Sequence, residues 1–338
     1  MNNDVIDLQN RDSYFDNLKV TLIFLVVATH YAGMYGDIPS MRGFYNALCS
    51  FLMPEFIFIS GYFSKKIISQ RKSDVINLLI PYILLQLYHL LFTKVSGLGN
   101  GSLNFTIPTF QNWYLLALFI WRLLIPYFNF FNKTAAIMLI FAISVGIGFI
   151  PQFNKFLALH RAIYYMPFFV LGYFFTDLKY LISRLHRYKT LFIVLFFCMT
   201  SAIMVVSYYS KKLSFIITYA YLPSFGYHSL KYYSAKTLLP FIIRVLGMIS
   251  SIIISWANLF LIPMKKTWYS KFGRHTLYVF FFHMFFVWPI ASFPYFPIIT
   301  EVCVLVFSLL IAVLLSQNFI VKMLTPLISP GHLWSKYI

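Results

Sequence analysis

The sequence predicts an all-α membrane protein, a polytopic bundle of about ten transmembrane helices, because of its composition and the arrangement of its apolar residues. Of its 338 residues, 60% are hydrophobic and only 11% are charged, whereas about 25% of the residues in a soluble domain are charged. The apolar residues gather in runs long enough to cross a bilayer, which takes roughly 20 residues of helix. Most runs lack the alternating polar residues of a membrane β-strand. This pattern excludes a water-soluble enzyme and a disordered chain.

The charge balance is strongly basic, with 27 Lys and Arg residues against 9 Asp and Glu residues, a formal net charge of +18. The cations lie between the apolar runs, as the excess of Lys and Arg in cytoplasmic loops predicts. No nucleic-acid motif accompanies them, so membrane lipid is the expected partner and nucleic acid is not. The three cysteines lie in apolar runs and are typical of small buried side chains rather than of a disulfide framework.

The predicted spans are the long apolar runs, at residues 18–36, 44–64, 75–95, 113–131, 134–151, 161–177, 190–208, 238–263, 272–291 and 298–320. A further apolar segment, 213–227, is short and is interrupted by Pro223 and Gly226. We expect it to be a re-entrant or interfacial piece on the outer side. If it crossed the membrane, the C-terminal half of the chain would invert.

The loops that would face the cytoplasm with an internal N-terminus hold 13 Lys and Arg residues, against 6 in the opposite loops, which predicts an N-in, C-in orientation. The first residues are polar and lack the basic start and short apolar core of a cleaved signal, so the first run is expected to stay as a span. The predicted organisation is a cytoplasmic N-terminal segment 1–17, a membrane domain 18–320 and a cytoplasmic tail 321–338.

Ionisable residues inside spans are costly and usually mark function. His30 follows Lys19 by eleven positions, which is nearly three helical turns, so the two side chains share one face about 16 Å apart. A cation near the membrane surface and a titratable imidazole deeper in suit an anionic cofactor whose reactive end reaches the histidine. A structural alternative fits equally well, with a histidine hydrogen-bonded to a neighbouring helix and a snorkelling lysine.

Three further residues inside the runs are candidates. A carboxylate at Glu55 needs a partner or a proton in hydrocarbon, and it could orient or charge-balance His30. Ser60 precedes a glycine, and this pair permits close helix approach, with packing alone as the simpler interpretation. His283 lies deep in the run 272–291 and is a second functional candidate.

Two residues stand where runs begin. Trp113 is expected at an outer boundary, where aromatic belts are common. Arg161 is either an interfacial anchor or a clamp for an anionic group. The eight histidines are dispersed without a ligand pair at helical spacing, so no metal is predicted.

Five segments in order, spread over roughly residues 11–320, resemble the integral-membrane acyltransferase family 3. Within it, the sequence is most similar to the fucose 4-O-acetylase type of bacterial capsule and exopolysaccharide biosynthesis. The segments are RDSYFDNLKVTLIFLVVATH, MPEFIFISGYFSKK, NWYLLALF, RAIYYMPFFVLGYFF and FGRHTLYVFFFH. The sequence departs from the family at Asn112, where relatives often have histidine, at His275, which replaces a frequent asparagine, and at Glu55, where an apolar residue is common.

The resemblance implies a multi-pass protein of the bacterial plasma membrane that moves an acetyl group from cytoplasmic acetyl-CoA to a hydroxyl of a cell-surface, capsular or exopolysaccharide glycan. The expected site consists of catalytic His30 and Glu55, of Lys19 and Arg161 for the acyl donor, and of Ser60, Trp113 and His283 for substrate or structural support. Whether an acyl-enzyme forms and whether a homo-oligomer assembles stay open. The alternative is a transporter or flippase of a lipid-linked glycan, although no internal repeat of the transporter kind is evident.

Overall fold

The computed structural model describes residues 12–66, 74–97, 104–150, 156–223 and 238–328. Within these ranges all regular structure is helical and there is no strand, which confirms the predicted all-α class. Among the described residues, five helices are long and apolar enough to cross a membrane, or six if the bent pair Ile299–Leu315 and Asn318–Ile328 counts as one span. These helices support a multi-pass membrane protein. The count of ten crossings stays a prediction.

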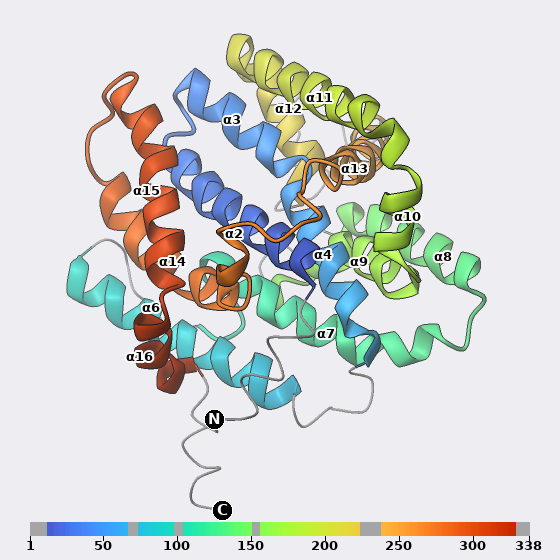
Figure 1. Cartoon of the computed structure of the whole chain (residues 1–338), viewed down its shortest axis with the longest axis horizontal. Coiled ribbons are helices and arrows are strands. Elements are labelled where there is room, and N and C mark those ends of the chain that lie inside the picture. The colour runs from blue at the N-terminus through green and yellow to red at the C-terminus, as the bar shows by residue number, and fades with distance from the viewer. Residues whose placement is uncertain (1–11, 67–73, 98–103, 151–155, 224–237, 329–338) are drawn as a thin grey trace, which may run out of the picture.

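Each predicted apolar run contains a helix. The α-helices are α2 (Ser13–Met34), α3 (Pro39–Cys49), α4 (Leu52–Phe63), α6 (Ile80–Ser96), α7 (Trp113–Phe128), α8 (Lys133–Gly146), α9 (Leu159–Phe174), α10 (Leu178–Arg184), α11 (Lys189–Tyr209), α12 (Lys211–Tyr221), α13 (Leu239–Asn258), α14 (Thr276–Ala291), α15 (Ile299–Leu315) and α16 (Asn318–Ile328). Helix α2 runs through the middle of the bundle (Figure 1) and packs against α3, α14 and α15.

The run 44–64 is not one continuous α-helix, because α3 ends at Cys49 and α4 begins at Leu52. Pro54 explains the break. It has no N–H to donate to the carbonyl of Ser50, four residues earlier, and its ring crowds that carbonyl. At the break, the hydroxyl of Ser50 donates a hydrogen bond to the carbonyl of Ala47, at 2.7 Å.

The segment 213–227 lies partly in α12, whose 11 residues span about 16 Å and cannot cross a hydrocarbon core of roughly 30 Å. Residues 224–227 are outside the described ranges. The predicted tail 321–338 begins within α16, which bends by 74° from α15. The Tyr88 hydroxyl of α6 donates to the carbonyl of Leu327 in α16, so α16 packs on the bundle. Residues 329–338 are outside the described ranges.

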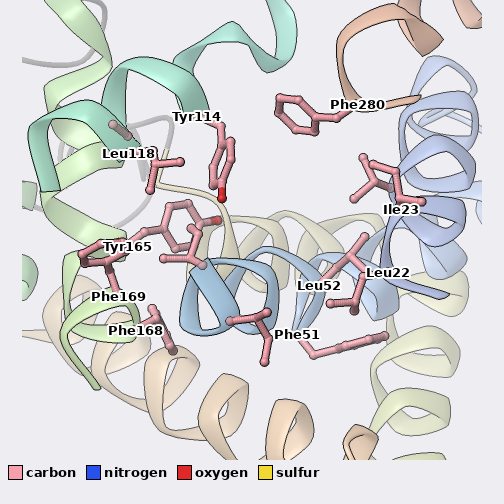
Figure 2. Packing of buried hydrophobic residues seen from close by; sticks show 14 of the residues in the cluster. Leu22, Ile23, Phe51, Leu52, Tyr114, Leu118, Tyr165, Phe168, Phe169 and Phe280 are labelled. Atoms are coloured by element: carbon pink, nitrogen blue, oxygen red, sulfur yellow. The ribbon is translucent and has the colours of Figure 1, made fainter. Parts of the chain in front are cut away.

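Two glycines permit a close crossing of α4 and α9. A Cβ atom on Gly61 would overlap the carbonyl group of Phe169, and one on Gly172 would overlap the carbonyl group of Phe58. Each glycine therefore admits the backbone of the other helix, as small residues do at membrane helix interfaces. The close approach expected beside Ser60 is confirmed. It packs α4 against α9, which supplies Tyr165, Phe168 and Phe169 to the buried core (Figure 2).

Candidate active site

A cavity of about 290 Å³ contains three of the predicted site residues, His30, Trp113 and Arg161. They come from three helices that are distant in sequence. His30 lies four residues before the end of α2, Trp113 is the first residue of α7, and Arg161 is near the start of α9. The cavity therefore lies at one end of the bundle. The other lining residues are Val26, Thr29, Tyr45, Cys49, Leu52, Met53, Pro108, Phe110, Tyr165, Leu222 and Pro223.

The imidazole of His30 is only partly buried and borders this cavity. In the part of the chain that the structure describes, no side chain or backbone group forms a hydrogen bond with it. The structural interpretation of His30 requires a hydrogen bond to a neighbouring helix. No such bond is formed among the described residues. A neutral imidazole without a protein partner can accept a proton from a bound molecule.

His283 lies directly beside His30, with 5.1 Å between the two ring centroids and an angle of 42° between the rings. It is fully buried in α14 and does not line the cavity. Its Nδ1 is 2.9 Å from the carbonyl oxygens of both Val279 and Phe280. Because carbonyls only accept, Nδ1 carries the hydrogen and Nε2 carries the lone pair. Nε2 has no hydrogen-bond partner among the described residues.

Arg161 and Trp113 form one wall of the cavity. The guanidinium carbon of Arg161 is 5.5 Å from the centre of the Trp113 ring, a cation–π arrangement. The ring of Trp113 is also stacked on Tyr165, with 5.6 Å between the ring centroids and an interplanar angle of 24°. A fixed guanidinium beside flat aromatic faces offers a cation for developing negative charge and surfaces for an amphipathic ligand.

The loop before α7 forms another wall and is held by Gln86 of α6. The Gln86 amide nitrogen donates to the carbonyls of Asn104 and Ile107, at 3.1 and 3.0 Å. Its oxygen accepts from the backbone of Thr109 at 2.9 Å and from the side chain of Asn112 at 3.0 Å. Asn112, which replaces the histidine of many relatives, is therefore part of the loop's support and does not line the cavity.

Within this loop, Phe110 lines the cavity with a φ of +43°, a left-handed conformation that is costly for a residue with a bulky side chain. Such strain of about 1–3 kcal/mol persists only where surrounding structure imposes it. The five hydrogen bonds of Gln86, which include one that its oxygen accepts from the hydroxyl of Thr109, supply that constraint. They hold Phe110 at the cavity wall.

Lys19 does not line the cavity. Its Nζ is 3.1 Å from an oxygen of Asp16 and 5.7 Å from the centre of the Phe63 ring. The helical rise places Lys19 about 16 Å from His30 along α2. The ion pair with Asp16 was not predicted, although residues three positions apart in a helix are neighbours on its surface.

Glu55 is buried in α4 and also lies outside the cavity lining. One carboxyl oxygen accepts a hydrogen bond from Asn258 of α13 at 2.8 Å, and the other has no partner among the described residues. The expected contact with His30 does not occur there. Ser60 is likewise outside the cavity, and its hydroxyl bonds to the hydroxyl of Tyr114 and to the carbonyl of Phe56.

Some cavity residues were missed by the sequence reasoning. Tyr165 follows Arg161 by four positions in α9, and Cys49 follows Tyr45 by four positions in α3, so each pair shares a helix face. That spacing could have pointed to Tyr165 once Arg161 was a candidate. Phe110 belongs to a loop, and nothing in its local sequence indicates that it reaches the cavity.

A helical membrane bundle that brings a histidine, an arginine and aromatic side chains to one cavity has the features of a membrane-embedded enzyme. A family model described as an acyltransferase domain matches residues 12–317. The chain therefore belongs to acyltransferase family 3, and the expected membership is confirmed. No curated protein and no solved structure matches the chain. Among the described residues, no group of three or more His, Cys, Asp or Glu side chains could hold a metal ion.

Proposed function

We propose that this protein is an O-acetyltransferase of the bacterial plasma membrane that moves an acetyl group from cytoplasmic acetyl-CoA to a hydroxyl of a cell-surface or exopolysaccharide sugar. The fucose 4-O-acetylase type is the subtype that its motifs favour. Membership of the acyltransferase family supports the reaction class. The observation that carries the proposal is the meeting of His30, Trp113 and Arg161 in one cavity.

In the proposed reaction, His30 is the general base. Its imidazole takes the proton of the acceptor hydroxyl as the hydroxyl oxygen attacks the carbonyl carbon of the thioester. Arg161 stabilises the negative charge that develops on the carbonyl oxygen. The carbon–sulfur bond then breaks, and the proton on His30 passes to the departing thiolate of coenzyme A. The products are an O-acetyl ester and the free thiol.

The geometry of α2 supports a donor that enters from the cytoplasm. With an N-in, C-in bundle of ten crossings, α2 begins at the inner surface and the cavity lies toward the outer one. Lys19 would hold a phosphate of coenzyme A near the inner surface, in place of its present contact with Asp16. The flexible pantetheine arm would then cover the distance of about 16 Å to His30.

The walls of the cavity suit a sugar acceptor. Trp113 and Tyr165 present stacked aromatic faces, and Phe110 and Tyr45 add further aromatic surface. A sugar ring has apolar faces, which pack on aromatic side chains, and a polar edge, which needs hydrogen-bonding groups. Arg161 and the hydroxyl of Tyr45 supply such groups, whereas the hydroxyl of Tyr165 already donates to the carbonyl of Tyr221.

The test uses the purified protein in lipid nanodiscs with radiolabelled acetyl-CoA and fucose-containing exopolysaccharide fragments. We expect label in the polysaccharide, and NMR of the product should show a new O-acetyl signal on one sugar carbon. A protein that moves a lipid-linked glycan across vesicles without transferring label would be a flippase. That result would contradict the proposal.

A further inference from the structure

A second cavity, distinct from the candidate active site, opens on the surface of the bundle beside the middle of α2. Its volume is about 200 Å³, and it lies between α2, α15 and the segment that precedes α14. The lining residues are Val20, Thr21, Ile23, Phe24, Trp268, Tyr269, Phe272, Leu309, Ala312, Val313 and Ser316. None of them lines the cavity that contains His30. We call this second cavity the α2–α15 groove.

The groove is continuous with the apolar surface of the protein. Helix α15 lies at the edge of the bundle (Figure 1), and its outward residues Leu305, Leu309 and Leu310 are exposed. Trp268, which also lines the groove, is 69% exposed. An apolar channel that opens onto exposed leucines in a membrane protein faces lipid chains rather than water. Tryptophan at such a position is typical of the membrane interface.

The segment that closes the groove is basic. Between Pro263 and Thr276 it contains Lys265, Lys266, Lys271 and Arg274 and no acidic residue, and all four cations are exposed. None of the four forms an ion pair with a carboxylate in the described part of the chain. Lys271 lies 5.0 Å from the ring of Phe272, a groove residue, so positive charge stands at the rim itself.

The rim is held in place rather than loosely attached. Asn17 of α2 is fully buried and donates to the carbonyls of Pro263 and Lys265, at 2.8 and 2.9 Å. Its side-chain oxygen accepts from the hydroxyls of Thr267 and Ser270, at 2.8 and 2.6 Å. This network fixes the basic segment against the start of α2, so the cations and the groove keep their relative positions.

We propose that the α2–α15 groove binds an anionic phospholipid, with one acyl chain in the groove and the phosphate headgroup at the basic rim. The apolar lining fits an acyl chain, and the cations, which have no carboxylate partner in the described part of the chain, attract a negative headgroup. Each Lys or Arg beside an anionic lipid surface strengthens the attraction by roughly fivefold. The site is independent of the proposed acetyl transfer.

The experiment measures quenching of Trp268 by lipids with brominated chains, taken as the difference between the parent protein and a Trp268→Phe variant in mixed micelles. The probes are brominated phosphatidylglycerol and brominated phosphatidylcholine with identical chains. We expect phosphatidylglycerol to associate at least about fivefold more strongly. A triple variant, Lys265→Gln, Lys266→Gln and Lys271→Gln, should bring the ratio close to one.

The matched control is Arg184→Gln, Arg187→Gln and Lys189→Gln, which removes the same charge around η7 (His186–Tyr188). It should leave the ratio unchanged. Ala312→Phe, which fills the groove, should weaken quenching by both lipids, and Thr21→Phe makes the same test if that variant does not fold. Equal quenching by the two lipids in the parent protein would overturn the proposal. Loss of the difference on adding coenzyme A would also overturn it, because the cations would then belong to a nucleotide site.

Discussion

The rings of His30 and His283 lie 5.1 Å apart, one bordering the cavity and the other buried behind it. Two carbonyls of α14 hold the hydrogen of His283 on Nδ1, so its other nitrogen keeps a lone pair. We infer that His283 positions His30 and supports the charge that His30 gains when it accepts a proton. It does not touch the cavity, so it acts through His30.

His283→Phe tests this positioning role because it keeps a ring beside His30 but removes both nitrogens. We expect kcat to fall at least about tenfold with little change in KM for acetyl-CoA, and the pH dependence of kcat to shift. His186→Phe, at an exposed site in η7, is the control. If His283→Phe keeps full activity and the same pH profile, the imidazole serves packing only.

Arg161→Lys tests the wall formed with Trp113. Lysine keeps the charge but lacks the planar guanidinium that stacks on the indole, so we expect kcat/KM to fall by roughly ten- to a hundredfold. Trp113→Ala should cause a similar loss, and the double variant should lose less than the product of the two, since the residues are in contact. Steady-state kinetics of the three variants measure this coupling.

The control for that cycle is Arg187, whose guanidinium carbon is 4.7 Å from the ring of the exposed Tyr188. Arg187→Lys changes the same chemistry away from the cavity and should leave kcat/KM unaffected. Strictly multiplicative effects of Arg161→Lys and Trp113→Ala would show that the stacked pair does not act as a unit.

Gln86→Leu should loosen the loop that carries Phe110. The change removes five hydrogen bonds and takes a partner from partly buried polar groups of the loop, at a cost of about 1–3 kcal/mol. We expect KM for the glycan acceptor to rise while the protein still accumulates in the membrane. Gln317→Leu, at an exposed site, should have no effect. An unchanged KM in Gln86→Leu would show that the loop does not shape the acceptor site.

Gly172→Ala should prevent the close packing of α4 and α9, because the added methyl group would meet the carbonyl of Phe58. We expect a strong loss of folded protein, measured by fluorescence-detected size-exclusion chromatography after detergent extraction. Gly146→Ala is the matched control, since no atom lies within 4 Å of the added Cβ and alanine favours helix by roughly 1 kcal/mol. Equal yields of the two variants would contradict the close-packing account.

The helices could be predicted from the sequence because hydrophobic runs of membrane length leave few alternatives. The break between α3 and α4 was missed even though Pro54 was visible, since apolar character continues across it. Gly61 and its neighbour Ser60 gave the correct expectation of close packing. Its partner, Gly172, could be identified only from the three-dimensional structure.

At the candidate site, His30, Trp113 and Arg161 could be predicted because charged or amphipathic residues stand out in apolar runs. Their meeting in one cavity could not be predicted from local spacing. Glu55 was predicted as a site residue for the same reason. It lies outside the cavity and accepts a hydrogen bond from Asn258, on a helix about 200 positions later in the chain. Burying an ionisable residue costs free energy, so such a residue can be picked out from the sequence. Only its neighbours in the structure show whether it serves catalysis or packing.

The most direct test of the account is acetyl transfer by His30→Ala, compared with the parent protein and with His186→Ala at equal protein levels. We predict that His30→Ala transfers radiolabelled acetyl groups to the polysaccharide about 10²–10⁴-fold more slowly, because the general base is gone. His186→Ala should match the parent. Transfer at the parental rate by His30→Ala would contradict the central claim that this imidazole accepts the proton of the acceptor hydroxyl.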